Sequence, residues 1–449
     1  MVATQDILFK ELSKDIVKLN RRMHKNKAKF TQYKPQGGIG ITRLENQTEL
    51  PAQFHSRQEY LSFPTYIKRK YEEKSKNYYE KRLIENNNYL KGNKNWKFPR
   101  NLDKLGFHKG EHHIALVHLD GNSMGKLVKN LIKNESNYGR GLYAYNKFST
   151  ELESTILNAM RRTIADLIHN IIDLEEEEII KPEKNKKNYK SLLPIRPIIL
   201  SGDDITFISH GLLGIGLAEN LIKNLNKERK DEKYKIDLLK NNLSISGGVL
   251  ITNYKFPFAR AYPLLEELTR SAKLKGKICN PNNKNNDNLF SWLDFQILNS
   301  GISSNLETMR RQQYNCPGCL KPDALEKTIN NNNMRMEQYN LLYRPWAILG
   351  KWGKNETYSR FEWDYFEKKI NYLKSYSSKW PRSQLKNLQK SFHISKDKIR
   401  EVILENKRRN RELEDSVELE SKEWTQTPYY DIIELIDYYN KIPITTEEI

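Results

Sequence analysis

The feature that most constrains the fold is a pair of apolar runs separated by a short polar turn. In "PIRPIILSGDDITFIS", residues 194–209, one apolar run ends in Ser-Gly-Asp-Asp and a second follows at once. Runs rich in β-branched residues on either side of a turn that contains glycine predict a tight β-hairpin, with Gly202 suited to the turn. The tip then carries two adjacent carboxylates, Asp203 and Asp204, and such close like charges repel one another.

The flanking segments give the hairpin a place in a larger fold. Upstream, "HIALVHLDGNSMGKLV" reads as a strand and a helix start, and residues 145–174 carry apolar residues at helical spacing. Downstream, "LLGIGLAENLIKNLNKERK" reads as a helix, "LSISGGVLITN" as a strand and "FARAYPLLEELTRSAKLKGK" as another helix. The order β-α-β-β-α-β followed by a helix predicts an α+β fold of the ferredoxin-like plan, with an antiparallel sheet and helices on one face.

Changes in composition and in predicted secondary structure divide the sequence into four expected parts. Residues 1–110 form an irregular basic N-terminal region, 111–300 the α+β domain, 301–356 a linker region with a Cys-x-x-Cys pair, and 357–449 a helical C-terminal domain. In the first part, residues 62–100 interleave aromatic residues with Lys and Arg. This composition suits contact with nucleic acid, although such a stretch is more often a solvated helix whose aromatic side chains pack inward.

The composition indicates which kind of partner and which cellular compartment to expect. Lys and Arg outnumber Asp and Glu by 76 to 56, a net charge of +20, which favours a polyanionic partner such as nucleic acid or nucleotides. Three Cys in 449 residues argue against a disulfide framework and for a reducing compartment. No signal peptide is evident, and no apolar run reaches the ~18 residues of a membrane span. We therefore expect a soluble cytoplasmic protein.

Asp120 ends the first strand of this plan, and the hairpin should pair beside that strand. The hairpin tip would then bring Asp203 and Asp204 close to Asp120. Carboxylates this close require a positive charge, and Mg²⁺ or Mn²⁺ prefers hard oxygen ligands that bridge carboxylates to phosphates. We expect two such ions, ~4 Å apart, on the three carboxylates and the Gly121 carbonyl. For either motif taken alone, a plain surface turn is the alternative.

Four stretches together resemble a known family: "HLDGNSMGKL", "IRPIILSGDDITFI", "LSISGGVLITNYKFPFARAYPLLEELTRSAK" and "WLDFQIL". Over roughly residues 112–300 they are similar to the second palm domain of the large subunit of type III CRISPR effector complexes. That family is related to the GGDEF-type and other nucleotidyl cyclases. The resemblance implies a palm domain that uses two metal ions to join ATP into cyclic oligonucleotide signals for antiviral defence. Two residues depart from the family pattern: Ser201 replaces a Gly of the hairpin motif, and Asn122 replaces an Asp.

The nucleotide is expected around the same two turns. Free backbone N–H groups at the helix start after Gly121 suit phosphate. Lys273 matches a lysine that reaches the triphosphate in the related cyclases, and an ordinary helix surface is the alternative for it. The expected nucleotide-binding residues are Gly121, Asn122, Ser123, Ser201, Gly202 and Lys273.

Cys316 and Cys319 form "CPGC", a knuckle suited to zinc. Zinc takes four ligands, so that Cys279, a His or a second subunit would have to complete the site. A redox pair is the alternative.

The resembled large subunits carry two palms and often a nuclease domain with a His-Asp dipeptide, which this sequence lacks. We therefore expect a compact, stand-alone relative: a nucleotidyltransferase or cyclase acting on ATP or another NTP. RNA, CRISPR-type RNA-binding subunits or a second copy of the chain are the further expected partners. The rival hypothesis is a catalytically silent palm that serves as an RNA-binding scaffold of a ribonucleoprotein complex, and a primer-making polymerase is a third. The sequence names neither the base nor the size and linkage of the product.

Overall fold

A computed structural model describes most of the chain, which divides into two compact units, residues 1–78 and 79–449. Among the helices described, none combines the length and the hydropathy that a membrane crossing requires. The described residues are 45, 50–56, 59–133, 135–181, 191–230, 237–279, 290–298, 305–317, 325–329, 332–336, 339, 341–350, 361–375, 380–411, 413 and 426–445.

The first unit contains a small hairpin and the start of a basic helix. Its elements are β1 (Phe54–Ser56), β2 (Glu59–Leu61) and α2 (Phe63–Glu80). Phe54 of the hairpin stacks on Tyr66 of the helix, with ring centroids 4.1 Å apart. Tyr71 and Tyr78 of the same helix are 49% and 50% exposed. In this basic segment Tyr66 therefore packs on the hairpin, whereas Tyr71 and Tyr78 are exposed.

The second unit is built on a six-stranded sheet in the order β12-β9-β8-β4-β7-β6. The strands are β4 (His113–Gly121), β6 (Ile195–Ser201), β7 (Asp204–His210), β8 (Ile245–Asn253), β9 (Ser291–Ile297) and β12 (Trp346–Leu349). The strands β8-β4-β7-β6 pair antiparallel throughout, which confirms the ferredoxin-like plan. β9 extends this sheet parallel to β8, and β12 pairs antiparallel with β9.

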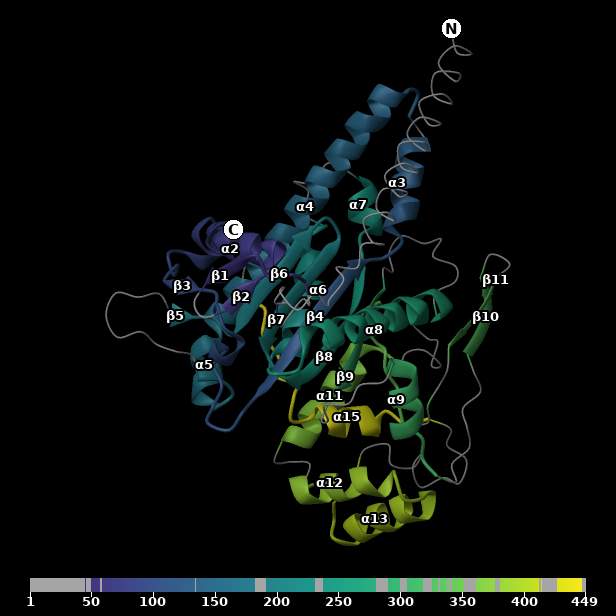
Figure 1. The fold of residues 1–449 in the computed structure, drawn as a ribbon. Coiled ribbons are helices and arrows are strands. Elements are labelled where there is room, and N and C mark those ends of the chain that lie inside the picture. The colour runs from purple at the N-terminus through teal and green to yellow at the C-terminus, as the bar shows by residue number, and fades with distance from the viewer. Residues whose placement is uncertain are drawn as a thin grey trace. The chain divides into compact units, whose positions relative to one another are not determined.

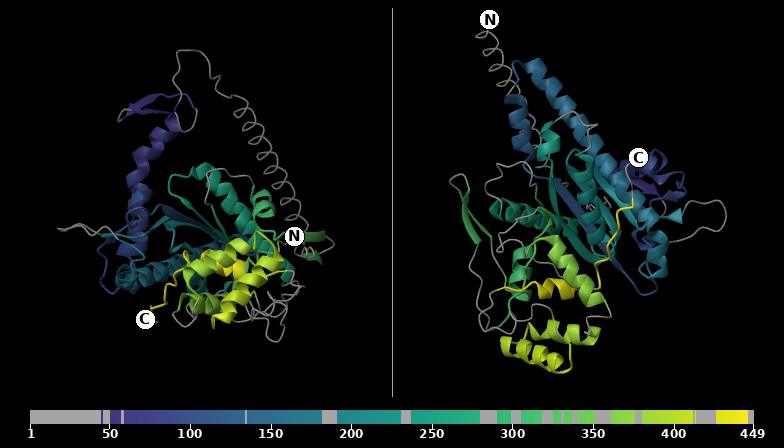
Figure 2. Two further views of the ribbon diagram at one scale, coloured as in Figure 1. Left: turned by 90° about the horizontal axis from the view of Figure 1, so that it is seen from below. Right: turned by 180° about the vertical axis from the view of Figure 1, so that it is seen from behind.

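Helices cover both faces of this sheet (Figures 1 and 2). They are α4 (Tyr138–His169), α6 (Gly214–Glu228) and α8 (Phe258–Cys279). Alternation along β4 explains the layers, because Val117 and Leu119 join the core formed with α4 and α6, whereas Ile114 and Leu116 join the core formed with α8. The two helices of the ferredoxin-like plan thus share one face, as predicted, and the helix that follows the plan covers the other.

Short elements connect these layers. They are three helical turns (Lys81–Glu85, Asn88–Leu90 and Leu102–Lys104), β3 (Trp96–Lys97), α3 (Met124–Lys133), α5 (Ile171–Glu176), β5 (Ser191–Leu192) and α7 (Asp237–Asn242). β3 and β5 pair parallel as a separate two-stranded sheet.

The segment expected to be a linker contains regular structure. It holds α9 (Leu306–Gln313), the antiparallel hairpin of β10 (Leu325–Ile329) and β11 (Asn332–Met336), and β12. The sequences "LEKTI" and "NNMRM" are too short and too polar to show a clear period, so periodicity gives no strand signal there.

The C-terminal part is helical, as predicted. Its helices are α11 (Trp363–Lys374), α12 (Arg382–Ser391), α13 (Lys396–Arg408) and α15 (Tyr429–Leu435). They share a core with the sheet rather than standing apart from it. The buried Arg344 donates to Glu434 Oε2 at 2.7 Å, and the Tyr439 hydroxyl donates to Glu219 Oε2 of α6 at 2.7 Å.

Candidate active site

The hairpin at residues 195–210 has the tight turn that the sequence predicts. Ser201 pairs with Asp204, which leaves Gly202 and Asp203 as the two central residues. Gly202 has φ +60°, the left-handed backbone that favours glycine, and Asp203 has no positive φ. A positive φ at the first central residue alone is the type II′ pattern of two-residue hairpins.

The hairpin tip lies at the end of β4. The register pairs Leu119 with Ile205, so Asp120 lies at the level of the turn on the adjacent strand. A Cβ atom on Gly121 would lie 2.7 Å from Asp203 Oδ2 and 2.5 Å from Met124 Cγ. A side chain at position 121 would therefore push Met124 or Asp203 aside, and glycine avoids this.

Two of the three predicted carboxylates meet directly. Asp120 lies within hydrogen-bonding reach of Asp203, and the pKa of Asp203 is raised, first by burial and then by the Asp120 charge. A backbone N–H group and the Lys273 ammonium act in the opposite direction. The two carboxylates thus form a repulsive pair that favours a nearby cation.

Lys273 supplies a cation to this pair. Its Nζ donates to Asp120 Oδ2 at 2.5 Å and to the Gly121 carbonyl at 2.8 Å. The side chains of Lys273 and Asp120 are 22% and 38% exposed, so the ion pair is open to solvent on one side. The ammonium occupies the same oxygens that the sequence assigns to a metal ion.

Asp204 lies on the next strand and makes a different contact. Its Oδ1 is 3.3 Å from His118 Nδ1, and the same nitrogen is 2.9 Å from Thr206 Oγ1. The Asp204 side chain is 40% exposed, although its Oδ1 atom is buried. Sequence reasoning overlooked His118, whose position two residues before Asp120 places both side chains on one face of β4.

The donor set has the chemistry of a magnesium or manganese site, but it is not assembled as one. Within the described part of the chain, no group of three or more His, Cys, Asp or Glu side chains is arranged to hold a metal ion. Asp120, Asp203 and the Gly121 carbonyl offer hard oxygen atoms around a position where a lysine ammonium already sits. The residues therefore offer donor atoms of the kind such a cation prefers, and two of the three predicted carboxylates lie within reach of each other.

Asn122 ties the loop after β4 to β8. Its side-chain amide donates to Ser244 Oγ and Ser246 Oγ, both at 3.0 Å, and its backbone N–H donates to the Ser244 carbonyl at 2.8 Å. The Asn122 N–H group is thus engaged within the protein rather than free for phosphate. Ser123 is exposed with φ +57°, and α3 begins directly after it.

The predicted cysteine pair falls partly outside the described residues. Cys316 is buried, and Cys319 lies in a segment that the structure does not describe. Cys279 is also buried, near the end of α8. Cys316 is disulfide-bonded in this structure, so that a zinc site at these residues stays a prediction that requires the reduced thiols.

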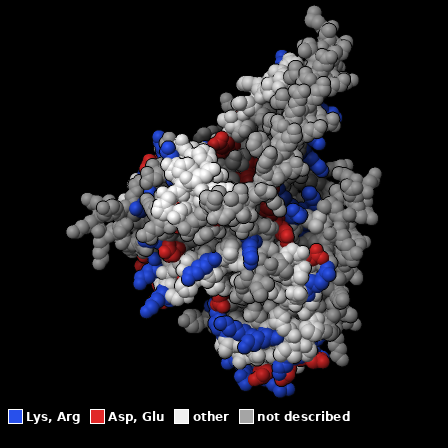
Figure 3. All heavy atoms as spheres, viewed as in Figure 1, with Lys and Arg blue, Asp and Glu red and all other residues white. Residues whose placement is uncertain are grey.

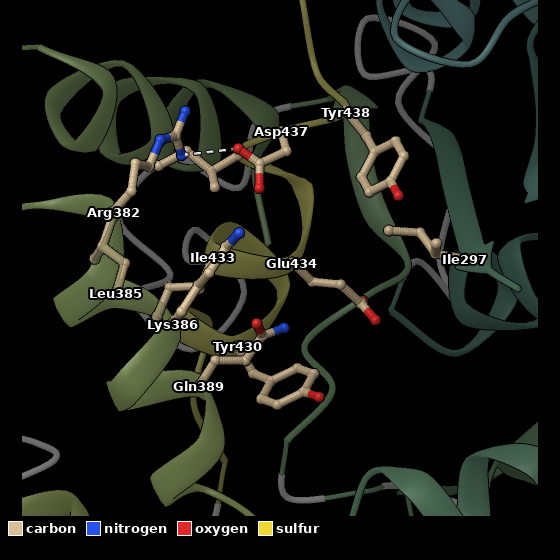
Figure 4. A pocket seen from close by; sticks show the side chains of 11 residues that line it. Ile297, Arg382, Leu385, Lys386, Gln389, Tyr430, Ile433, Glu434, Asp437 and Tyr438 are labelled. Carbon is tan, nitrogen blue, oxygen red and sulfur yellow. Dashed lines mark ion pairs between the residues drawn. The ribbon is translucent and has the colours of Figure 1, made fainter. Parts of the chain in front are cut away.

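A separate cavity of about 320 Å³ lies between the end of β9 and the C-terminal helices (Figure 4). Two basic side chains, Arg382 and Lys386, and two acidic ones, Glu434 and Asp437, line it. Arg382 and Asp437 pair across 3.4 Å. This balance of charge does not favour a triphosphate, and none of the carboxylates at the hairpin tip lines the cavity.

Comparison with protein families agrees with the topology. Residues 113–280 match the family model of the Cas10/Cmr2 second palm domain, which covers fewer than half of the 449 residues. No curated protein matches the chain. The matched segment runs from β4 through α8 and contains Asp120, the hairpin tip and Lys273. Residues 113–280 therefore form a second palm domain of the Cas10/Cmr2 family.

Proposed function

We propose that this protein is a metal-dependent nucleotidyltransferase that makes a cyclic nucleotide or cyclic oligonucleotide signal from ATP or another NTP. The observation that carries the proposal is the cluster of Asp120, Asp203 and Lys273 at the end of a palm strand. The palm family is nucleotidyl cyclase-like. We place the protein, by the same family relation, in CRISPR-associated antiviral defence.

The proposed site uses the chain's own groups as follows. Asp120, Asp203 and the Gly121 carbonyl would hold Mg²⁺ or Mn²⁺, and Asp204 would add a further carboxylate from the adjacent strand. The bound ions supply activation of a ribose hydroxyl and charge stabilisation of the leaving pyrophosphate. The ribose hydroxyl would give up its proton to solvent water, and its oxygen would bond to the α-phosphorus. The bond from that phosphorus to the bridging oxygen of the β-phosphate would break, and pyrophosphate would leave with the bonding electron pair.

Lys273 has a second role in this proposal. Lys273 would leave the Asp120 carboxylate when the site holds a divalent ion, because the ammonium and the ion would use the same oxygens. The freed ammonium then meets the β- or γ-phosphate of the nucleotide. The side chain thus neutralises the carboxylates before the substrate binds and neutralises the triphosphate afterwards.

The test is pyrophosphate release from radiolabelled ATP and the other NTPs, with Mn²⁺ or Mg²⁺ and with or without RNA. The double substitution Asp203→Ala and Asp204→Ala should abolish release while the protein stays folded, because it removes clustered like charges. The matched control is Glu401→Ala with Glu405→Ala on α13, which removes two exposed carboxylates. Turnover of the Asp203/Asp204 variant at the wild-type rate would contradict the proposal.

A silent scaffold is the second candidate, and the exposed Tyr71 and Tyr78 on a basic helix favour it. Such a protein would bind single-stranded RNA yet release no pyrophosphate with any NTP and metal ion. RNA binding without turnover in the same assay would therefore decide for the scaffold.

A further inference from the structure

We propose that the palm carries a docking surface for an extended peptide, and that residues 439–445 of the same chain, the strap, are its built-in occupant. The strap follows α15, has no helical or strand structure, and runs from the helical C-terminal part onto the palm (yellow in Figure 2). The α4–α6 surface lies where α4 ends and α6 begins, on the face of the sheet opposite α8. Lys273 lies on α8, so the surface is independent of the proposed function. The residues of the surface are Asp166, Asn170, Gly216 and Asn220.

Side chains of the palm bind the main chain of the strap. The Asn220 amide donates to the Ile442 carbonyl at 3.2 Å, and the Asn170 amide donates to the Pro443 carbonyl, also at 3.2 Å. Because the strap belongs to no helix or strand, its carbonyl groups depend on such donors. Hydrogen bonds to the main chain are a general way in which proteins bind extended peptides.

Asp166 is the centre of the α4–α6 surface. Its side chain is fully buried, and Asn220 and Asn224 of α6 donate to its Oδ2 at 3.0 and 2.9 Å. Its Oδ1 accepts from the backbone N–H and the hydroxyl of Thr445 in the strap, at 2.9 and 3.2 Å. The palm thus provides donors for one carboxylate oxygen, and the strap provides donors for the other. Removing the strap would take both Thr445 donors from a buried acceptor, which is costly.

The contacts also define which peptide fits. Ile442 is 3% exposed and joins the core formed with α4 and α6, whereas its neighbours Lys441 and Pro443 are exposed. A Cβ atom on Gly216 would lie 2.0 Å from the Asn440 carbonyl oxygen, so an alanine there would displace the main chain of the strap. The surface therefore takes an extended segment with one buried, branched apolar side chain and a backbone donor three residues later.

The strap can leave its site without unfolding the palm. Segments that take no part in a helix or sheet open locally, at a lower free energy than the core does. The covalent tether keeps the strap at a high effective concentration, so a free peptide of the same sequence competes poorly with it. Weakening the strap by one side chain should therefore open the α4–α6 surface to that free peptide.

The experiment measures binding of a fluorescent peptide of residues 439–446, YNKIPITT, to the full chain by fluorescence anisotropy. Ile442→Asp in the chain weakens the strap and leaves every residue of the α4–α6 surface in place. We expect this variant to bind the peptide about 100-fold more tightly than wild type does. Ile394→Asp, at a side chain that is 59% exposed, is the matched control and should bind as weakly as wild type.

A second substitution tests the surface itself. Gly216→Ala, added to Ile442→Asp, should remove the peptide binding, because the new Cβ atom occupies the path of the peptide main chain. Alanine is the better helix former, so α6 should tolerate the change. Equal peptide affinity of wild type and the Ile442→Asp variant, or of that variant with and without Gly216→Ala, overturns the inference. Melting temperatures report folding. If Ile442→Asp does not fold, Ile442→Ala takes its place, with tighter peptide binding expected and wild-type affinity overturning the inference.

Discussion

At the scale of single residues, the Lys273 ammonium offsets the repulsion between the Asp120 and Asp203 carboxylates. Asp120 and Asp203 lie within reach of each other, and the Lys273 ammonium bonds to one of them and to the Gly121 carbonyl. Two like charges at a hairpin tip would otherwise repel. The lysine is therefore not an ordinary helix-surface residue in the protein without ligand.

Lys273→Ala should weaken NTP binding and slow turnover, by about 1.5–3 kcal/mol for one lost charge-assisted bond. Without ligand the change should cost at most about 1 kcal/mol of unfolding free energy, since the ion pair is partly exposed. The measurement is the rise in melting temperature on adding ATP and Mg²⁺, which tracks affinity. Lys277→Ala, one turn further along α8, is the control. If ATP and Mg²⁺ raise the melting temperature of the Lys273 variant as much as that of wild type, Lys273 does not contact the nucleotide.

Asp203→Asn should raise the melting temperature at pH 7 when no divalent ion is present. The pKa of Asp203 is raised in the folded state, so protonation stabilises the fold at low pH and this stabilisation is lost as pH rises through the folded pKa. The amide mimics the protonated form. Its advantage should shrink as pH falls to about 4, near the ordinary carboxyl pKa. A variant less stable than wild type at pH 7, by thermal denaturation, would contradict this account. Glu401→Gln is the control.

At the scale of elements, α8 both packs on the sheet and carries Lys273. Leu264, Leu265 and Leu268 pack against the sheet, as their helical spacing predicts. Near its C-terminus, Lys273 reaches the end of β4. The helix thus links the packing of the sheet to the position of the ammonium.

The hairpin turn depends on its glycine. Gly202→Ala should lower the free energy of unfolding by about 1 kcal/mol or more, because alanine is strained at φ +60°. Gly125→Ala in α3 is the matched change. It meets no atom within 4 Å and should be neutral or slightly stabilising, because alanine is the better helix former. Urea denaturation of both variants measures the difference, and equal effects would place the strain elsewhere.

At the scale of the whole molecule, the net charge is strongly positive. The chain carries +20, yet the face in Figure 3 shows Lys and Arg interspersed with Asp and Glu. The basic segment expected to contact nucleic acid, residues 62–100, also contains the fully buried Leu83 and Ile84. Deleting that whole segment would remove core, so charge substitution is the better test.

Lys68→Gln with Lys70→Gln on α2 should flatten the salt dependence of RNA binding. Each lost phosphate contact removes about 0.7 from the slope of log affinity against log salt for a single strand. Fluorescence anisotropy with a single-stranded RNA at several salt concentrations measures it. Lys386→Gln with Lys390→Gln on α12 is the control, and equal slopes for wild type and the α2 variant would move RNA contact elsewhere.

The sequence by itself determined the palm topology and the hairpin, because both depend on local signals. Apolar periodicity marks the strands and helices, and glycine marks the turn at Gly202. The meeting of Asp120 and Asp203 followed from strand order alone, since antiparallel neighbours bring the end of one strand to the start of the next. The family of this segment was readable from the same stretches.

Only the tertiary structure decided how the side chains pair. Lys273 and Asp120 are 153 residues apart in sequence, and the contact of His118 with Asp204 depends on the register between β4 and β7. The strand β12 and the β10–β11 hairpin have sequences too short or too polar to show a period. Such contacts arise from packing and desolvation across the folded sheet, which no local pattern encodes.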